Sequence, residues 1–169
     1  THWLSGDWRE GDRWPGAEVY TSESTCFDRT RLQRLFDDTI ILALAGCNEG
    51  DGTFHRHAAL LFRTWFLDEE TRMNPNLNFA QIEPNRAPLE GPARGIIEMK
   101  NIYFFLDAIR LLELSGALTE KDKMELSNWL REYLDWLLTS PQGLIECKSK
   151  DNHGTCYDLQ VASISSYLG

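Results

Sequence analysis

The sequence lacks any apolar run long enough to cross a bilayer. Residues 40–45 form one of the longest, far short of the roughly 20 residues that a membrane-spanning helix needs. The first residues carry Asp, Arg and Glu and do not resemble the apolar core of a signal peptide. We therefore expect no membrane partner and no targeting segment. A mature secreted protein and a cytosolic protein fit this pattern equally well.

Cysteine is scarce, and the four cysteines do not form the paired CxxC spacing of a zinc site. Cys26 and Cys47 lie near opposite ends of one expected helix, on the order of 25–30 Å apart, and so cannot bond to each other. Cys147 and Cys156 are close enough in sequence to pair across a glycine-containing loop. Adding His153 to these two cysteines does not give the spacing of a common zinc finger, so neither a metal nor another cofactor is expected.

Basic residues are in the minority, because 17 Lys and Arg stand against 26 Asp and Glu and give a net charge of −9. Nucleic acid is therefore not an expected partner, since phosphate binding normally needs a basic face. The same sign lowers the expectation for any polyanionic ligand. It does not exclude one, because a cleft can be locally basic on an acidic protein.

Alternating strand patterns are absent, and apolar residues recur at helical spacing instead. Helices are expected over residues 27–45, 53–67, 96–114, 119–138 and 157–168. Asp28 is the expected N-cap of the first helix and Gly46 its stop, and Thr119 with Asp122 resembles a capping box. The sequence thus predicts an all-α fold of antiparallel helical hairpins. This local pattern does not separate a bundle from an arc of an α/α toroid.

Two segments lack a regular pattern. Residues 1–25 hold three tryptophans and one tyrosine among Gly, Asp, Ser and Pro, which indicates an irregular aromatic arm. Residues 71–95 contain four prolines, which exclude a persistent helix or a central strand. A loop of this length in a compact domain is usually functional. Residues 26–169 are expected to form one helical domain.

Reactive side chains are densest at residues 148–157, in a polar segment before the last expected helix. His153 can act as a general base near neutral pH, and the Asn152 amide can hydrogen-bond a neutral or partly neutralised carboxyl group. A surface loop in which His153 only caps a turn explains the same residues. His55 and His57 lie two positions apart on a helix, so they are not expected to share a metal ion.

The tryptophans fall into two groups. Trp65, Trp129 and Trp136 fall on the apolar stripes of expected helices, which favours core positions over ligand-stacking surfaces. The tryptophans of the N-terminal arm are better stacking candidates. Packing of the arm against the body explains them equally well.

Several stretches resemble the alginate-lyase domain family in order and spacing. The segment Asn74-Pro75-Asn76-Leu77-Asn78-Phe79-Ala80-Gln81 resembles a family loop, and residues 64–67 (TWFL) resemble the helix end before it. Residues 95–97 (GII), 129–137 (WLREYLDWL), 152–155 (NHGT) and 157–161 (YDLQV) follow in the family order. The resemblance covers about residues 60–168 and implies part of an incomplete α/α toroid. It also implies cleavage of acidic uronate glycans by β-elimination.

The resemblance assigns roles to particular residues. It implies that Asn152 and His153 lie in the cleft of the toroid, where Asn152 helps to neutralise the uronate carboxylate. His153 would share that role or remove the C5 proton. Gln81, Arg94 and Tyr157 are the candidate substrate contacts. The family usually protonates the departing O4 with a tyrosine well downstream, and Tyr157 is too close to be that residue, so we expect a C-terminally truncated domain.

The sequence departs from the family pattern at three positions. The family often has Arg where Pro92 stands, Asn where Asp151 stands and Trp where Cys156 stands. Asp151 adds negative charge beside a site meant for a carboxylate. Because Cys156 replaces a bulky aromatic residue across one loop from Cys147, a disulfide between them is expected if the protein is secreted.

These features predict an extracellular polysaccharide lyase that acts on alginate or a related polyuronate. The alternative is a catalytically incomplete lyase-like protein that binds the glycan, which the departures at positions 92, 151 and 156 favour. A helical interaction module whose motifs only preserve packing is a third possibility. The first two share an acidic polysaccharide as the expected partner.

Overall fold

The structure is a computed structural model, and it describes residues 8–9, 12–13, 27–50, 52–82 and 90–169. Its helices are α1 (Asp28–Glu49), α2 (Gly52–Phe66), the 3₁₀ helix η2 (Ala93–Met99), α3 (Ile102–Leu114), α4 (Glu120–Thr139), α5 (Pro141–Glu146) and α6 (Asn152–Leu168). A two-residue antiparallel ladder pairs β1 (Trp8–Arg9) with β2 (Asp12–Arg13). The expected all-α class is confirmed. Most of the expected aromatic arm lies outside the described residues.

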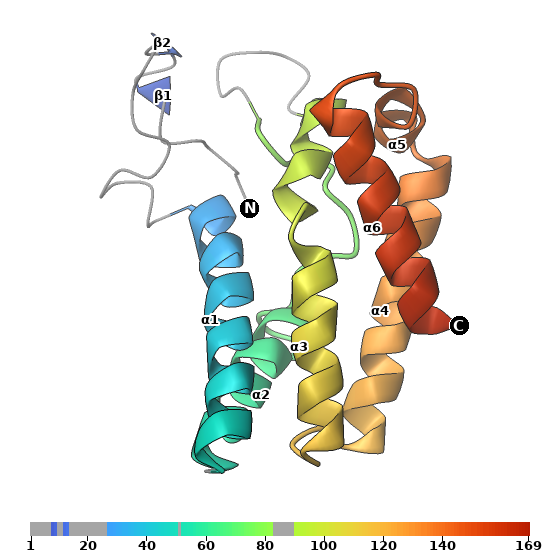
Figure 1. Cartoon of the computed structure of the whole chain (residues 1–169). Coiled ribbons are helices and arrows are strands. Elements are labelled where there is room, and N and C mark those ends of the chain that lie inside the picture. Colours follow the sequence, from blue (N-terminus) through green and yellow to red (C-terminus); the bar gives the residue numbers. More distant parts are fainter. Residues whose placement is uncertain (1–7, 10–11, 14–26, 51, 83–89) are drawn as a thin grey trace.

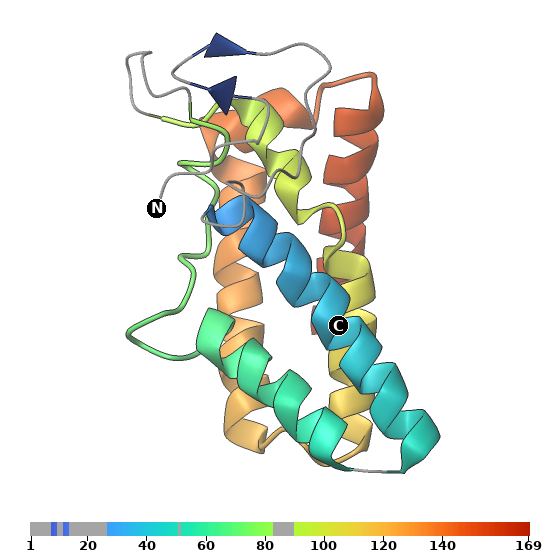
Figure 2. The same cartoon turned by 90° about the vertical axis from the view of Figure 1, so that its left-hand side faces the viewer.

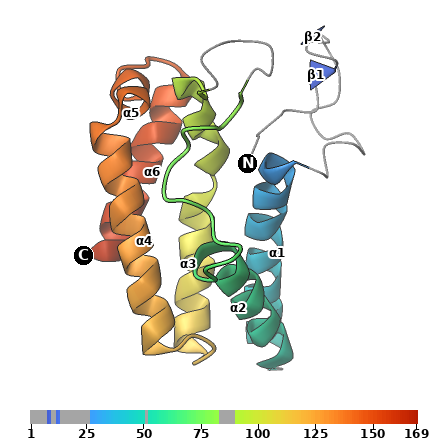
Figure 3. The same cartoon turned by 180° about the vertical axis from the view of Figure 1, so that it is seen from behind.

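The helices form antiparallel hairpins arranged as part of an incomplete α/α toroid. Figure 1 shows α1, α3 and α6 side by side, and α3 packs against both of the others. Helices α2 and α4 run back in the opposite direction behind this row, as the view from behind in Figure 3 makes clear. Helix η2 lies directly before α3 and in line with it. The starts of α1, η2 and α6 therefore lie toward the same end of the molecule.

A row of aromatic rings joins the helices through the core. The Phe105 ring of α3 lies 5.2 Å from Phe36 of α1 and 5.2 Å from Phe66 of α2, measured between ring centroids. Phe66 meets Trp129 of α4 edge to face at 4.8 Å, and Trp129 stacks on Tyr133 at 5.3 Å. Such contacts combine large buried area with a defined ring geometry. They fix the spacing of α1, α2, α3 and α4.

The segment after α2 runs along α4 toward η2 (Figures 2 and 3). Two tryptophans of α4 hydrogen-bond to it through their indole groups. Trp129 donates its indole N–H to the Met73 carbonyl oxygen at 2.8 Å, and Trp136 donates to Asn78 Oδ1 at 2.9 Å. Trp129 is 5% exposed, so its expected core position is confirmed. Trp129 and Trp136 thus attach the loop at residues 73–78 to α4.

Several helix boundaries differ from those expected. Phe27 is the N-cap of α1, and Asp28 is its first residue. Gly46 does not end α1. It lies inside the helix and packs against His55, where a Cβ would lie 2.5 Å from the imidazole ring. The helix ends instead at Gly50, whose φ of 66° lies in the left-handed region that glycine adopts readily. The expected capping box of Thr119 and Asp122 at the start of α4 is confirmed.

The second half of the chain has more helix than the sequence predicts. The expected helix 96–114 divides into η2 and α3. Ser140 ends α4 and at once caps α5 by accepting a hydrogen bond from the Gly143 amide. Asp151 caps α6, which begins at Asn152 rather than at Tyr157. None of the described helices has both the length and the apolar character required to span a bilayer.

Candidate active site

The Asn152–His153 pair opens helix α6. The Asp151 side chain accepts a hydrogen bond from the His153 amide at 2.9 Å and from the Ser149 hydroxyl at 2.8 Å. The Ser149 hydroxyl and, after it, the His153 amide lower the pKa of Asp151. Gly154 permits this tight start, because a Cβ there would lie 2.1 Å from the Ser149 carbonyl oxygen. The segment expected to be a loop is therefore the first turn of a helix.

His153 is paired with a buried carboxylate. Its Nδ1 lies 2.7 Å from Oε1 of Glu146, the last residue of α5, and the two side chains are 25% and 5% exposed. A carboxylate accepts, so Nδ1 carries the proton of the neutral imidazole and Nε2 keeps its lone pair. The same carboxylate stabilises the imidazolium that forms when Nε2 takes up a proton. This arrangement suits a general base.

A second polar cluster holds Gln81. Its Nε2 donates to Glu98 Oε1, and Arg29 Nε donates to the other oxygen, Oε2, at 2.7 Å. The Arg29 and Glu98 side chains are only 12% and 6% exposed. Gln81 has a φ of 54°, a conformation that few residues other than glycine adopt. The Arg29–Glu98 ion pair thus fixes the amide of a residue whose backbone is itself strained.

Gln81 is further clamped by two glycines. A Cβ on Gly91 would lie 2.2 Å from the Ala80 carbonyl oxygen, and one on Gly95 would lie 2.7 Å from the Ala80 Cβ. Gly91 also donates its amide hydrogen to the Asn78 carbonyl oxygen at 2.7 Å. Residues 78–81 and 91–95 therefore approach each other closely because Gly91 and Gly95 have no side chains.

Helix η2 connects the two clusters. Gln160 of α6 donates to the Ile96 carbonyl oxygen of η2 at 3.0 Å and accepts from the buried Tyr133 hydroxyl at 2.8 Å. Both α5 and α6 pack on η2, which carries Glu98. Arg94 lies in the first turn of η2 and is exposed. The clusters around His153 and Gln81 are therefore parts of one packed end of the domain.

Tyr157 does not have the position expected of a substrate contact. Its side chain is buried, at 6% exposure, and its hydroxyl donates to the Leu137 carbonyl oxygen at 3.2 Å. Burial raises the pKa of this phenol, with a further contribution from the Cys147 thiol. Tyr157 ties α6 to the end of α4. Asn152, by contrast, is exposed at the helix start.

The expected disulfide between Cys147 and Cys156 is not formed, and both thiols are free. Cys147 caps the end of α5, and its thiol donates to the Leu144 carbonyl oxygen at 3.3 Å. Cys156 lies within α6. The expectation treated both residues as flanks of one loop, whereas the helix has already begun before Cys156.

Three residues of these clusters escaped the sequence analysis: Arg29, Glu98 and Glu146. Glu98 left a weak signal, because it is a single acidic residue within the apolar stretch at 96–99. Glu146 left none, since α5 itself was not expected. Among the described residues, no group of three or more potential metal-ligating side chains comes together.

The hairpins form an arc of an α/α toroid, the fold of the helical-toroid polysaccharide lyases, and the Asn152–His153 pair lies at the start of α6. Residues 9–169 match the alginate lyase family, and the chain belongs to that family. A crystal structure of an alginate lyase from Bacteroides ovatus superposes with a TM-score of 0.85 at 32% sequence identity. The match covers 94% of this chain and 41% of that lyase. No curated protein matches the chain.

Proposed function

We propose that this chain is the part of an extracellular polysaccharide lyase that carries the proton-transfer pair for β-elimination of an acidic uronate glycan, such as alginate. The observation that carries the proposal is the contact of 2.7 Å between His153 Nδ1 and the buried Glu146 carboxylate, at the Asn-His motif. The solved lyase from Bacteroides ovatus, described as an alginate lyase, supports the choice of substrate.

The exposed Asn152 side chain at the start of α6 is the proposed donor to the uronate carboxylate. Partial neutralisation of that carboxylate makes the neighbouring C5 proton more acidic. The Asp151 carboxylate already accepts the His153 amide at this helix start, so the backbone there does not offer a second anion site. The negative charge of Asp151 opposes a uronate carboxylate, and a cation is needed to offset it.

Elimination then proceeds from His153. Its Nε2 takes the C5 proton, the C5–H electron pair becomes the C4–C5 double bond, and the C4–O4 bond breaks with its electrons on O4. The imidazolium remains paired with Glu146. An acid must protonate the departing O4, and Tyr157 is not that acid because its hydroxyl is buried against Leu137.

Gln81 is proposed to contact the sugar. Since its Nε2 donates to Glu98, its Oε1 is oriented away from that bond and can accept from a sugar hydroxyl. Arg94, exposed on η2, is the proposed cationic partner of a uronate carboxylate. The mechanism uses proton transfer alone, so a chelator is expected to leave the rate unchanged.

The test compares His153→Ala with His57→Ala in the intact protein. Replacement of His153 should lower the rate of unsaturated-end formation on alginate by roughly 100- to 10,000-fold. It also leaves the buried Glu146 carboxylate without this partner, so a stability loss of roughly 1–3 kcal/mol is expected beside the much larger effect on the rate. His57 is an exposed histidine on α2, and its replacement should leave the rate unchanged. The new double bond is followed by ultraviolet absorbance.

Two results would contradict the proposal. If His153→Ala kept a near-normal rate, His153 would not be the base. If the unaltered protein bound alginate without producing unsaturated ends, it would be the catalytically incomplete glycan-binding protein instead.

A further inference from the structure

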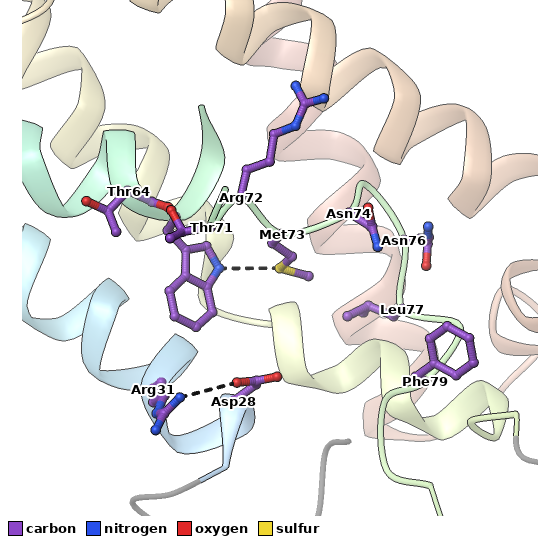
Figure 4. A pocket seen from close by; sticks show the side chains of 11 residues that line it. Asp28, Arg31, Thr64, Thr71, Arg72, Met73, Asn74, Asn76, Leu77 and Phe79 are labelled. Atoms are coloured by element: carbon purple, nitrogen blue, oxygen red, sulfur yellow. Dashed lines mark hydrogen bonds and ion pairs between the residues drawn. The ribbon is translucent and has the colours of Figure 1, made fainter. Parts of the chain in front are cut away.

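A cavity lies beside the loop that carries the family motif, and it shares no lining residue with the Asn152–His153 pair. Its volume is about 360 Å³, and its walls come from the start of α1, the end of α2 and residues 71–79 (Figure 4). This volume falls in the range of roughly 300–1,000 Å³ that is typical of small-molecule sites. The space is therefore large enough for a sugar unit of a polysaccharide.

The wall formed by the loop combines aromatic and amide groups. Phe79 lines the cavity and is 46% exposed, unlike the buried core phenylalanines. Asn74 and Asn76 contribute side-chain amides on the same side (Figure 4). An exposed aromatic ring beside amide groups can stack on the apolar face of a sugar ring and hydrogen-bond its hydroxyls.

The wall formed by α1 supplies a cation. Arg31 forms a long ion pair with Asp28 Oδ1 at 3.8 Å, drawn as a dashed line in Figure 4, and its side chain is 56% exposed. Because this contact is longer than a hydrogen bond, the exposed guanidinium group can also bind a ligand carboxylate.

A second cavity, on the α4 side of the loop, has a more acidic lining than the first. It measures about 390 Å³ and is lined by Glu125 and Glu132 of α4. Arg72 lines both cavities, and in Figure 4 its side chain extends away from the first. Two glutamates repel a uronate, so the second cavity is the poorer anion site.

The loop between the cavities is already held in place. Trp129 and Trp136 donate to Met73 and Asn78 from α4, as described above, and Trp65 donates to the Met73 sulfur at 3.4 Å, drawn as a dashed line in Figure 4. A site with a fixed wall loses little conformational freedom when it binds a ligand.

We propose that this cavity is an accessory subsite for one uronate unit of a polyuronate chain, with Arg31 on the carboxylate and Phe79 against the ring. The identity of the polymer rests on the proposed function, whereas the presence of an anionic-sugar site does not. Such a subsite adds affinity for long chains without touching the reacting atoms, so it lowers KM and leaves kcat unchanged.

The experiment measures binding of a long oligouronate to the intact protein by calorimetry, with His153→Ala present in every sample to prevent cleavage. Arg31→Ala and Phe79→Ala should each weaken the affinity by roughly tenfold, equivalent to about 1.4 kcal/mol. Two matched controls should bind normally: Arg34→Ala, an exposed arginine of α1 that does not line the cavity, and Phe104→Ala, a phenylalanine 50% exposed on α3.

A neutral oligosaccharide of equal length tests whether binding needs the carboxylate charge. Its affinity should be the same for Arg31→Ala as for the protein with Arg31. Unchanged affinity in both Arg31→Ala and Phe79→Ala would overturn the subsite, and equal weakening of neutral and acidic ligands by Arg31→Ala would overturn its uronate preference. Unaltered protein that forms no unsaturated ends contradicts the lyase proposal alone, because the binding comparison does not depend on turnover.

Discussion

At the scale of single residues, the chemistry of His153 depends on Glu146. A neutral histidine has two possible tautomers, and the buried carboxylate 2.7 Å from Nδ1 selects the one with a basic Nε2. Glu146 touches His153 rather than the substrate, so it is a positioning residue. Its removal should therefore affect turnover more than binding.

Glu146→Gln is expected to lower kcat by roughly 10- to 100-fold, because an amide does not balance the charge of the imidazolium, and to leave KM nearly unchanged. Steady-state rates of unsaturated-end formation give both constants. Glu132→Gln, an exposed glutamate on α4, is the control and should behave like the unaltered protein. A lower midpoint of thermal unfolding together with a normal kcat would identify Glu146 as a purely structural residue.

At the scale of the elements, the start of α4 is secured by more than its capping box. Asp122 closes the box with Thr119 and also receives two hydrogen bonds from Arg63 of α2, at 3.0 Å and 2.7 Å. Arg63 is the main cause, and Thr119 a lesser one, of a pKa of about 2 for Asp122. One carboxylate thus ties two helices together.

The charge of Asp122 should stabilise the protein in a pH-dependent way. Since its folded-state pKa lies below the ordinary value of 3.8, the stabilisation is complete above about pH 4 and is lost as pH falls toward 2. With allowance for solvent screening, Asp122→Asn should cost about 1 kcal/mol at pH 7. The difference from the unaltered protein should shrink in acid.

Urea unfolding at several pH values measures this difference. Asp107→Asn removes one partner of an exposed ion pair with Arg110 and should have little effect at any pH. A deficit in Asp122→Asn that stayed constant down to pH 2 would show that the charge is not what stabilises the contact.

The start of α6 depends on a residue without a side chain. Gly154→Ala would place a Cβ 2.1 Å from the Ser149 carbonyl oxygen and displace the turn that carries Asn152 and His153. We expect a stability loss of roughly 1–3 kcal/mol and a lower lyase rate. Gly52→Ala is the control, because its nearest neighbour is the movable end of Arg56 at 3.1 Å. Equal thermal stability and activity of the two variants would contradict this account.

At the scale of the whole molecule, the aromatic row joins four helices through the core. Phe105 contacts Phe36, Phe62 and Phe66 and is 1% exposed. Phe105→Ala should cost roughly 3–5 kcal/mol, because it opens a cavity where three helices meet. Phe104→Ala, half exposed on the same helix, should cost less than about 1 kcal/mol. Chemical denaturation distinguishes them, and similar losses in both would contradict the assigned core.

Features encoded by neighbouring residues were predictable from the sequence. The spacing of apolar residues indicated the helices that became α1 to α4, and Thr119 and Asp122 form the predicted capping box. Errors arose where local patterns compete with packing. Gly46 has the residue type of a helix stop, yet it lies inside α1, where the absence of a side chain lets His55 pack against it. Ser140, Pro141 and Gly143 indicated an end of helix, and they also begin a new one.

The sequence by itself determined the all-α class, the helical hairpins and the Asn-His motif, because periodicity, caps and motifs act between residues only a few positions apart. The tertiary structure decided which charges meet. Glu146 reaches His153 across 7 positions, Gln81 reaches Glu98 across 17, and Glu98 reaches Arg29 across 69. It also buried Tyr157 and left Cys147 and Cys156 unbonded. These pairings follow from how helices pack against one another, and no local pattern encodes that packing.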